Sequence, residues 1–270
     1  GRAWRAPLQA RNPRIIFEDA LPHWAPDRAF AQIVNAGSLI IPAVEIFLNK
    51  GMARALSEIS DPATRHDIEI FMAQEGSHYR YHRLFNKVMV ARYPELRAFD
   101  TELTAEYEAM LKTRSLRDCA AYCEGFESLG LIQAEFFFGH VDDLLEGADA
   151  RVVRLWQWHL AEEFEHRSVC FDVHRQLGGD YLSRVRGFAL AARHLGQWGK
   201  RVSDHLIACD AAALDAASRA RLNAEERTYR RRLLRFSLPR ILAILSPAYD
   251  PGGKAAPRGS IRLLESLTAS

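Results

Sequence analysis

Two Glu-x-x-His tetrads, Glu75 to His78 and Glu163 to His166, are the residues of this 270-residue chain best placed to do chemistry. Because an α-helix turns by about 100° per residue, a Glu and a His three positions apart lie on one face and can bind the same cation. A bundle with two such helices, and one further Glu on each of two others, supplies the donors of a dinuclear site. The tetrads therefore predict a pair of metal ions between four helices.

The spacing of two further carboxylates supports this arrangement. Antiparallel helices place residues side by side when those residues are equidistant from the connecting turn. An Asp-Pro turn lies midway between Glu45 and Glu75, and the region beside Gly147 lies midway between Glu127 and Glu163. Both carboxylate pairs can therefore face each other at one depth of a bundle.

Several residues near these positions leave alternatives open. Glu124 and Glu135 lie on roughly the same helical stripe as Glu127. The spacing favours Glu127 as the donor from the helix expected over 116–145. His159 shares a face with the second tetrad and can be a further ligand. His82 lies four residues after the first tetrad. It is either a ligand or, as we favour, a group that orients a carboxylate.

The donor types indicate which metal the site prefers. Carboxylates bridge two cations and lower their repulsion, while imidazole suits iron, manganese or zinc. A site richer in Glu than in His favours iron or manganese over structural zinc, which prefers Cys and His. We expect two iron ions (Fe2+/Fe3+), with manganese or zinc as alternatives. Glu75 and Glu163 are the expected bridging, catalytic carboxylates. One ion is assigned to Glu45 and His78, and the other to Glu127, His159 and His166.

The elements that must position these donors are helical throughout. No long stretch alternates polar and apolar residues, so the sequence predicts an all-α fold. The donor set is that of a ferritin-like four-helix bundle, here with extra helices and an irregular tail. We expect an extended, proline-containing arm over 1–27, a helical domain over 28–238 and a tail over 239–270. The expected helices cover 28–57, 61–93, 96–112, 116–145, 151–177, 181–207 and 218–236.

Composition narrows the class of protein. The formal net charge is +2, which provides no global field for nucleic acid. The four cysteines lack paired spacing, which favours a reducing cytoplasm. The apolar stretch 30–48 contains Gln32, Asn35 and Glu45, so a core helix is favoured over a membrane span. The arginines of 230–235 predict a solvated helix face, with weak membrane-surface contact as the alternative.

The residues around the tetrads also resemble known families. The repeated spacing of Glu and Glu-x-x-His is similar to that of the di-iron N-oxygenases of para-aminobenzoate, with Gln74 in place of an acid. That resemblance implies seven protein ligands, including His159. Over roughly 28–210 the chain more closely resembles the bacterial family of predicted metal-dependent hydrolases. The similar runs are 74–82, 155–166 and 171–173, although 128–130 departs from that family's histidine-containing pattern.

The ligand set and the family name point to different reactions. The ligands favour an iron oxidase or oxygenase that uses O2 to oxidise a small, largely apolar molecule, whereas the name implies a dinuclear hydrolase. A non-catalytic iron-binding protein is a third alternative. We expect Ile41 and Phe47 to line the substrate pocket. The partners that this chemistry admits are the substrate, O2, an electron donor and a second copy of the chain.

Overall fold

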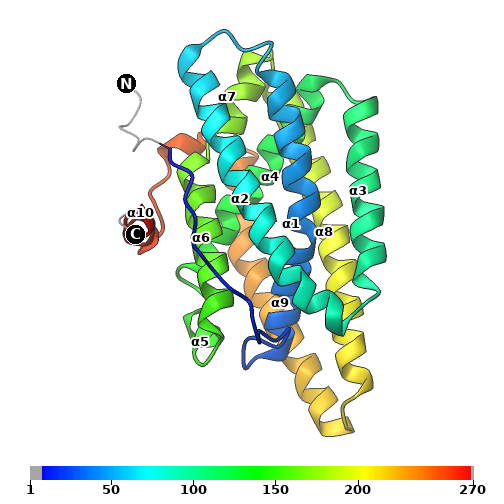
Figure 1. Cartoon of the computed structure of the whole chain (residues 1–270). Coiled ribbons are helices and arrows are strands. Elements are labelled where there is room, and N and C mark those ends of the chain that lie inside the picture. The colour runs from blue at the N-terminus through cyan, green and yellow to red at the C-terminus, as the bar shows by residue number, and fades with distance from the viewer. Residues whose placement is uncertain (1–7, 269–270) are drawn as a thin grey trace.

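The computed structural model describes residues 8–268 as a helical bundle with no strand in that range (Figure 1). The predicted all-α helical-bundle class is confirmed. The helices are α1 (Arg28–Ala55), α2 (Pro62–Arg92), α3 (Leu96–Thr113), α4 (Leu116–Phe137), α5 (Asp142–Leu145), α6 (Ala150–His166), α7 (Val169–Gln176), α8 (Tyr181–Ala212), α9 (Ala216–Ile244) and α10 (Ser260–Thr268), with a 3-10 turn at Pro251–Gly253.

Local capping chemistry explains where the long helices begin. Asp27 accepts a hydrogen bond from the backbone N–H of Phe30, and Asp61 accepts one from that of Thr64, which satisfies N–H groups left free at each helix start. Pro62 occupies the first turn of α2, where its missing N–H costs nothing. These signals set where α1 and α2 begin, and with it the positions of the predicted metal donors along them.

Two predicted helices are shorter than expected. The helix expected over 116–145 is α4, which ends at Phe137, and Gly139 follows in the connecting turn. The fourth helix is broken after His166. There the Arg167 side chain donates to the carbonyl of Phe164 and to that of Pro251 in the tail, which anchors the break to a distant segment. A separate helix, α7, then begins at Val169.

The last long helix extends further than expected. α9 continues through Pro239 to Ile244, although proline removes one backbone hydrogen bond. Arg240 holds the chain at this point, because its guanidinium lies over the ring of Phe236 and donates to Glu135 of α4. Tertiary contacts therefore offset the loss at the proline. The irregular part of the tail starts after this helix.

The apolar helix α1 lies inside the bundle. By length and composition it could cross a membrane, but 78% of its most apolar window is buried within the protein, as the sequence predicted for a core helix.

Helices α4 and α8 approach each other closely. A Cβ on Gly187 would lie 2.4 Å from the carbonyl oxygen of Ala121, and a Cβ on Gly125 would lie 2.8 Å from the Cα of Phe188. Only glycine permits this approach.

The N-terminal arm runs along α6 in an extended conformation, and α10 packs beside it (Figure 1). The carbonyl of Trp24 accepts a hydrogen bond from the Asp149 N–H just before α6. Residues 1–7 and 269–270 of the predicted arm and tail lie outside the described residues. The division of the chain into arm, helical domain and tail stays a prediction.

Candidate metal centre

The structure brings all seven predicted metal donors together in the interior, and each is at most 2% exposed. They come from four helices. α6 contributes three because their spacing continues the buried stripe that Val152 and Leu155 begin. The donors are Glu45 on α1, Glu75 and His78 on α2, Glu127 on α4, and His159, Glu163 and His166 on α6.

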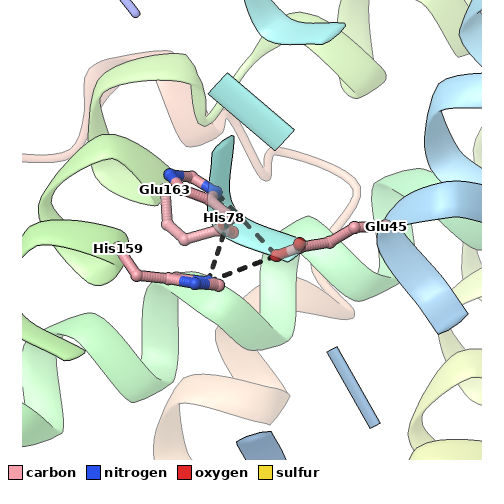
Figure 2. Close-up of side chains that lie close together, drawn as sticks. All are labelled: Glu45, His78, His159 and Glu163. Atoms are coloured by element: carbon pink, nitrogen blue, oxygen red, sulfur yellow. Dashed lines mark ion pairs between the residues drawn. The ribbon is translucent and has the colours of Figure 1, made fainter. Parts of the chain in front are cut away.

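One group of four donors consists of Glu45, His78, His159 and Glu163, with ligand atoms within 4.8 Å of one another. Figure 2 shows these side chains pointing toward a common point, and they come from α1, α2 and α6. Nδ1 of His78 lies 3.8 Å from Glu45 Oε1 and 3.6 Å from Glu163 Oε1. Nε2 of His159 lies 3.7 Å and 3.3 Å from the same two oxygens. These separations leave a point between the atoms that a cation can share.

A second group consists of Glu75, Glu127, Glu163 and His166. Nε2 of His166 lies 3.3 Å from Glu75 Oε1, 3.1 Å from Glu127 Oε2 and 3.5 Å from Glu163 Oε1. Glu163 therefore belongs to both groups. Glu75 also lies 3.5 Å from His78 Nδ1, so it faces both histidines of the tetrads.

One sequence-based assignment is wrong in detail. His159 was expected beside His166 and Glu127, but it lies with Glu45 and His78. Its ring stacks on that of His78, with centroids 4.3 Å apart. His159 precedes Glu163 by one helical turn on α6 and His166 follows it, so the two histidines lie on opposite sides of that carboxylate. The helical register therefore gives each group one histidine from α6.

The donor atoms fit divalent cations because the protein leaves them without other partners. Among the described residues, Nδ1 of His78, Nε2 of His166 and both carboxylate oxygens of all four glutamates are buried and make no hydrogen bond. A buried polar atom without a partner costs about 1–3 kcal/mol or more. A metal ion would satisfy these atoms together, as carboxylate and imidazole donors do in metal sites.

The pKa values reflect crowding of like charge. Burial, followed by the neighbouring carboxylates, raises the pKa of Glu45 and of Glu127 well above 4.5. Burial opposes protonation of His78, but its contacts with Glu162 and Glu75 raise its pKa to about 9. Burial and then the nearby His78 lower the pKa of His159 to about 4. The cluster therefore holds more carboxylates than its histidines can neutralise. Bound protons or metal cations must balance this negative charge.

Behind the donors, charged side chains fix the rings. Nε2 of His78 lies 3.0 Å from Glu162 Oε2, which leaves Nδ1 to face the centre. Arg11 of the N-terminal arm donates to Glu162 at 3.3 Å and makes two bonds to Glu165, at 2.9 and 3.0 Å. The arm is therefore part of the structure that orients the metal donors. Arg11 was not predicted from the sequence, because no local pattern links the arm to α6.

Each remaining histidine of the centre also has a partner behind it. Nδ1 of His166 lies 3.0 Å from the amide oxygen of Gln74. Nδ1 of His159 lies 3.0 Å from Nε2 of His82, whose other nitrogen contacts Ser38 at 2.8 Å. His82 is thus placed behind a predicted ligand and outside both donor groups. It contacts a histidine, where the sequence suggested a carboxylate.

The two alternative carboxylates on α4, Glu124 and Glu135, lie outside both donor groups. Glu124 accepts a hydrogen bond from Ser128, and burial raises its pKa to about 7. Glu135 accepts from Arg240 and Lys254 near the tail. Only Glu127 of the three candidates on α4 reaches the donor groups.

A largely apolar cavity of about 440 Å³ reaches His159 and Glu163 from the side of α8 and α9. Ile41 lines it, as predicted. The prediction for Phe47 is wrong, because its ring packs instead against Tyr107 and Tyr122 in the core. The size lies in the range of pockets for small molecules.

Comparison with known proteins identifies the family. The family described as "predicted metal-dependent hydrolase" matches residues 9–254, which include every donor of both groups. No curated protein and no solved structure matches the chain. Since the match spans most of the sequence, the chain belongs to the family of predicted metal-dependent hydrolases.

Proposed function

We propose that the buried cluster binds two divalent cations that share Glu163, and that the protein is a dinuclear metal enzyme acting on a small, largely apolar substrate. One observation carries this proposal. Two four-donor groups with a common carboxylate lie in the protein interior, and most of their donor atoms have no hydrogen bond among residues 8–268. Structural polar clusters normally satisfy such atoms within the protein.

In this proposal Glu45, His78 and His159 hold one cation, and Glu75, Glu127 and His166 hold the other. Glu163, which belongs to both donor groups, would be shared by the two ions, and Glu75, which faces both His78 and His166, would be the second shared carboxylate. When bound, such a pair lowers the pKa of water and polarises a substrate oxygen or, if it is iron, exchanges electrons with dioxygen. The protein supplies the donors, their orientation and an apolar cavity that ends at Glu163.

We place hydrolysis first among the reaction classes. The family description supports it directly, and the match covers the whole candidate centre. In such a reaction the apolar cavity binds the substrate and holds the scissile bond beside Glu163. On the same side Gly130 places no side chain against the Glu163 carboxylate.

Oxidation with O2 is the second class, and the donor set favours it. Four glutamates and three histidines form a set richer in carboxylate than typical zinc sites, which suits iron. The resemblance to ferritin-like proteins and to the di-iron N-oxygenases supports the same alternative. This reaction would need iron, O2 and an electron donor.

Parallel activity measurements separate the two classes. Protein purified anaerobically is loaded with Fe2+, Mn2+ or Zn2+, and each form is tested on p-nitrophenyl esters and phosphates and for O2 consumption. Hydrolysis predicts turnover without O2 that is lost in Glu163→Ala. Oxidation predicts O2 consumption and a visible absorption change in the iron form only. Absence of both activities from every loaded form would count against an enzymatic role.

A further inference from the structure

The cavity beside the metal centre is elongated along the bundle. On α4 the lining runs from Phe126, which precedes the predicted donor Glu127, to Phe137. On α8 the lining runs from Ala192 to Ser203, which at about 1.5 Å per residue spans about 16 Å. One end of this long space therefore lies at the metal centre and the other lies well away from it.

The close contact between α4 and α8 shows which end of α8 lies far from the metal centre. Gly187 meets Ala121, and Gly125 meets Phe188, so the two helices run in parallel at this level. Residues 196–203 of α8 consequently lie level with the last turns of α4, beyond the metal donors. Lys200 and Ser203, together with Arg230 of α9, line this distant end.

The two ends of the cavity differ in the charge of the residues that line them. Apart from Glu163 at the metal centre, Lys200 and Arg230 are the only formally charged residues that line the cavity in the described chain. Both cations are ion-paired. Lys200 pairs with Asp204, and Arg230 pairs with Asp204 at 2.9 Å and with Glu226 at 2.8 Å, but neither acid lines the cavity. The walls between the two ends are mainly aliphatic and aromatic. Such a space suits a long apolar body with one anionic end.

Glycines keep the cavity open at two levels. A Cβ on Gly196 or Gly199 of α8 would meet no atom within 4 Å, so packing does not require glycine at either position. Glycine in a helix interior is less favourable than alanine. At the inner end a Cβ on Gly130 would lie 2.7 Å from Glu163 Oε2, so a side chain there would cover this carboxylate oxygen. The oxygen is buried and has no hydrogen-bond partner among residues 8–268.

We propose that this cavity binds an elongated apolar molecule with one carboxylate, oriented with the carboxylate at Lys200 and Arg230 and the apolar end at Glu163. The inference rests on the proposed function, and it specifies the substrate class of that same centre. It makes Gly196 and Gly199 determinants of ligand size, while Lys200 and Arg230 determine its charge.

Calorimetric titration with ten-carbon probes tests the charge preference without any enzymatic turnover. Decanoate, 1-decanol and decyltrimethylammonium are titrated into the metal-loaded full chain at low salt. We expect decanoate to bind at least about tenfold more tightly than either other probe, a difference of about 1.4 kcal/mol. Replacing both cations, with Lys200→Gln and Arg230→Gln, should remove that preference. The neighbouring exposed Arg231→Gln serves as the matched control and should retain it.

Filling the cavity tests its location. Gly196→Leu combined with Gly199→Leu should weaken decanoate binding at least about tenfold, whereas Gln197→Leu, at a neighbouring exposed position that does not line the cavity, should not. Thermal unfolding confirms that each variant is folded. Equal binding of the three probes, or unchanged decanoate binding in the filled variant, would overturn the proposal. Metal content is measured in the same samples, so loss of ligand binding with two ions retained is distinguished from failure of the metal centre.

Discussion

The amide of Gln74 joins His166 to Glu165. Its oxygen lies 3.0 Å from Nδ1 of His166, and its Nε2 donates to Glu165 Oε2 at 2.7 Å. The related sequence pattern has an acid at this position, which could accept from the histidine but could not donate to a carboxylate. The neighbouring Glu165, already paired with Arg11, therefore explains why this chain has an amide at position 74.

Gln74→Glu tests this explanation. The variant places a second carboxylate against Glu165 in a buried position, and we expect it to lower the free energy of unfolding by about 1–3 kcal/mol. Urea unfolding at pH 7 measures the change. Gln197→Glu on the exposed side of α8 provides the control and should have little effect. Equal stability of Gln74→Glu and the parent would show that the amide donor is dispensable.

His82→Ala tests the support behind His159. Without the contact at 3.0 Å, the His159 ring loses the group that fixes its orientation, and we expect metal affinity to fall about 10- to 100-fold. Competition with a chelator measures that affinity. The exposed His66→Ala should behave as the parent. A His82→Ala protein with parental affinity would mean that His159 is held by packing alone.

The helices and most donors could be predicted because their signals are local. The caps at Asp27 and Asp61 and the i, i+3 spacing of each tetrad depend on one helix at a time. Burial of Glu45 followed from its place in an apolar helix. These features need no knowledge of distant contacts.

The parts that could not be predicted depend on contacts between distant segments. Helix α4 ends earlier than expected, so the midpoint of the connection between α4 and α6 falls before Gly147. The distance of each glutamate from that turn therefore no longer selects Glu127 as the donor on α4. The rotation of α4 decides instead, because Glu124 turns toward Ser128. The position of Arg11 requires the arm to dock on α6, and no short-range pattern encodes that.

Asp210 of α8 is buried, and its hydrogen-bond partners are distant in the sequence. Burial raises its pKa, but hydrogen bonds with His23, Gln32 and Tyr93 outweigh burial and hold it below 3.8. The folded pKa is depressed, so this carboxylate contributes stability above about pH 4 that is lost as the pH falls through the folded pKa.

Asp210→Asn should therefore lower the free energy of unfolding by about 2 kcal/mol at pH 7, and the difference from the parent should shrink below pH 4. Urea unfolding between pH 3 and 7, with chelator present in both proteins, measures this. Asp142→Asn, on an exposed residue, is the control. A difference that stays constant over the whole range would contradict the assigned pKa direction.

The central claim is that seven buried side chains bind a pair of cations. Elemental analysis of protein purified anaerobically tests it most directly, because it gives the identity and number of ions per chain. We predict two ions per chain in the parent and in His66→Ala, and loss of most metal in Glu75→Ala and in His166→Ala, with each variant shown to be folded. A metal-free parent, or equal metal content in all four proteins, would contradict the account.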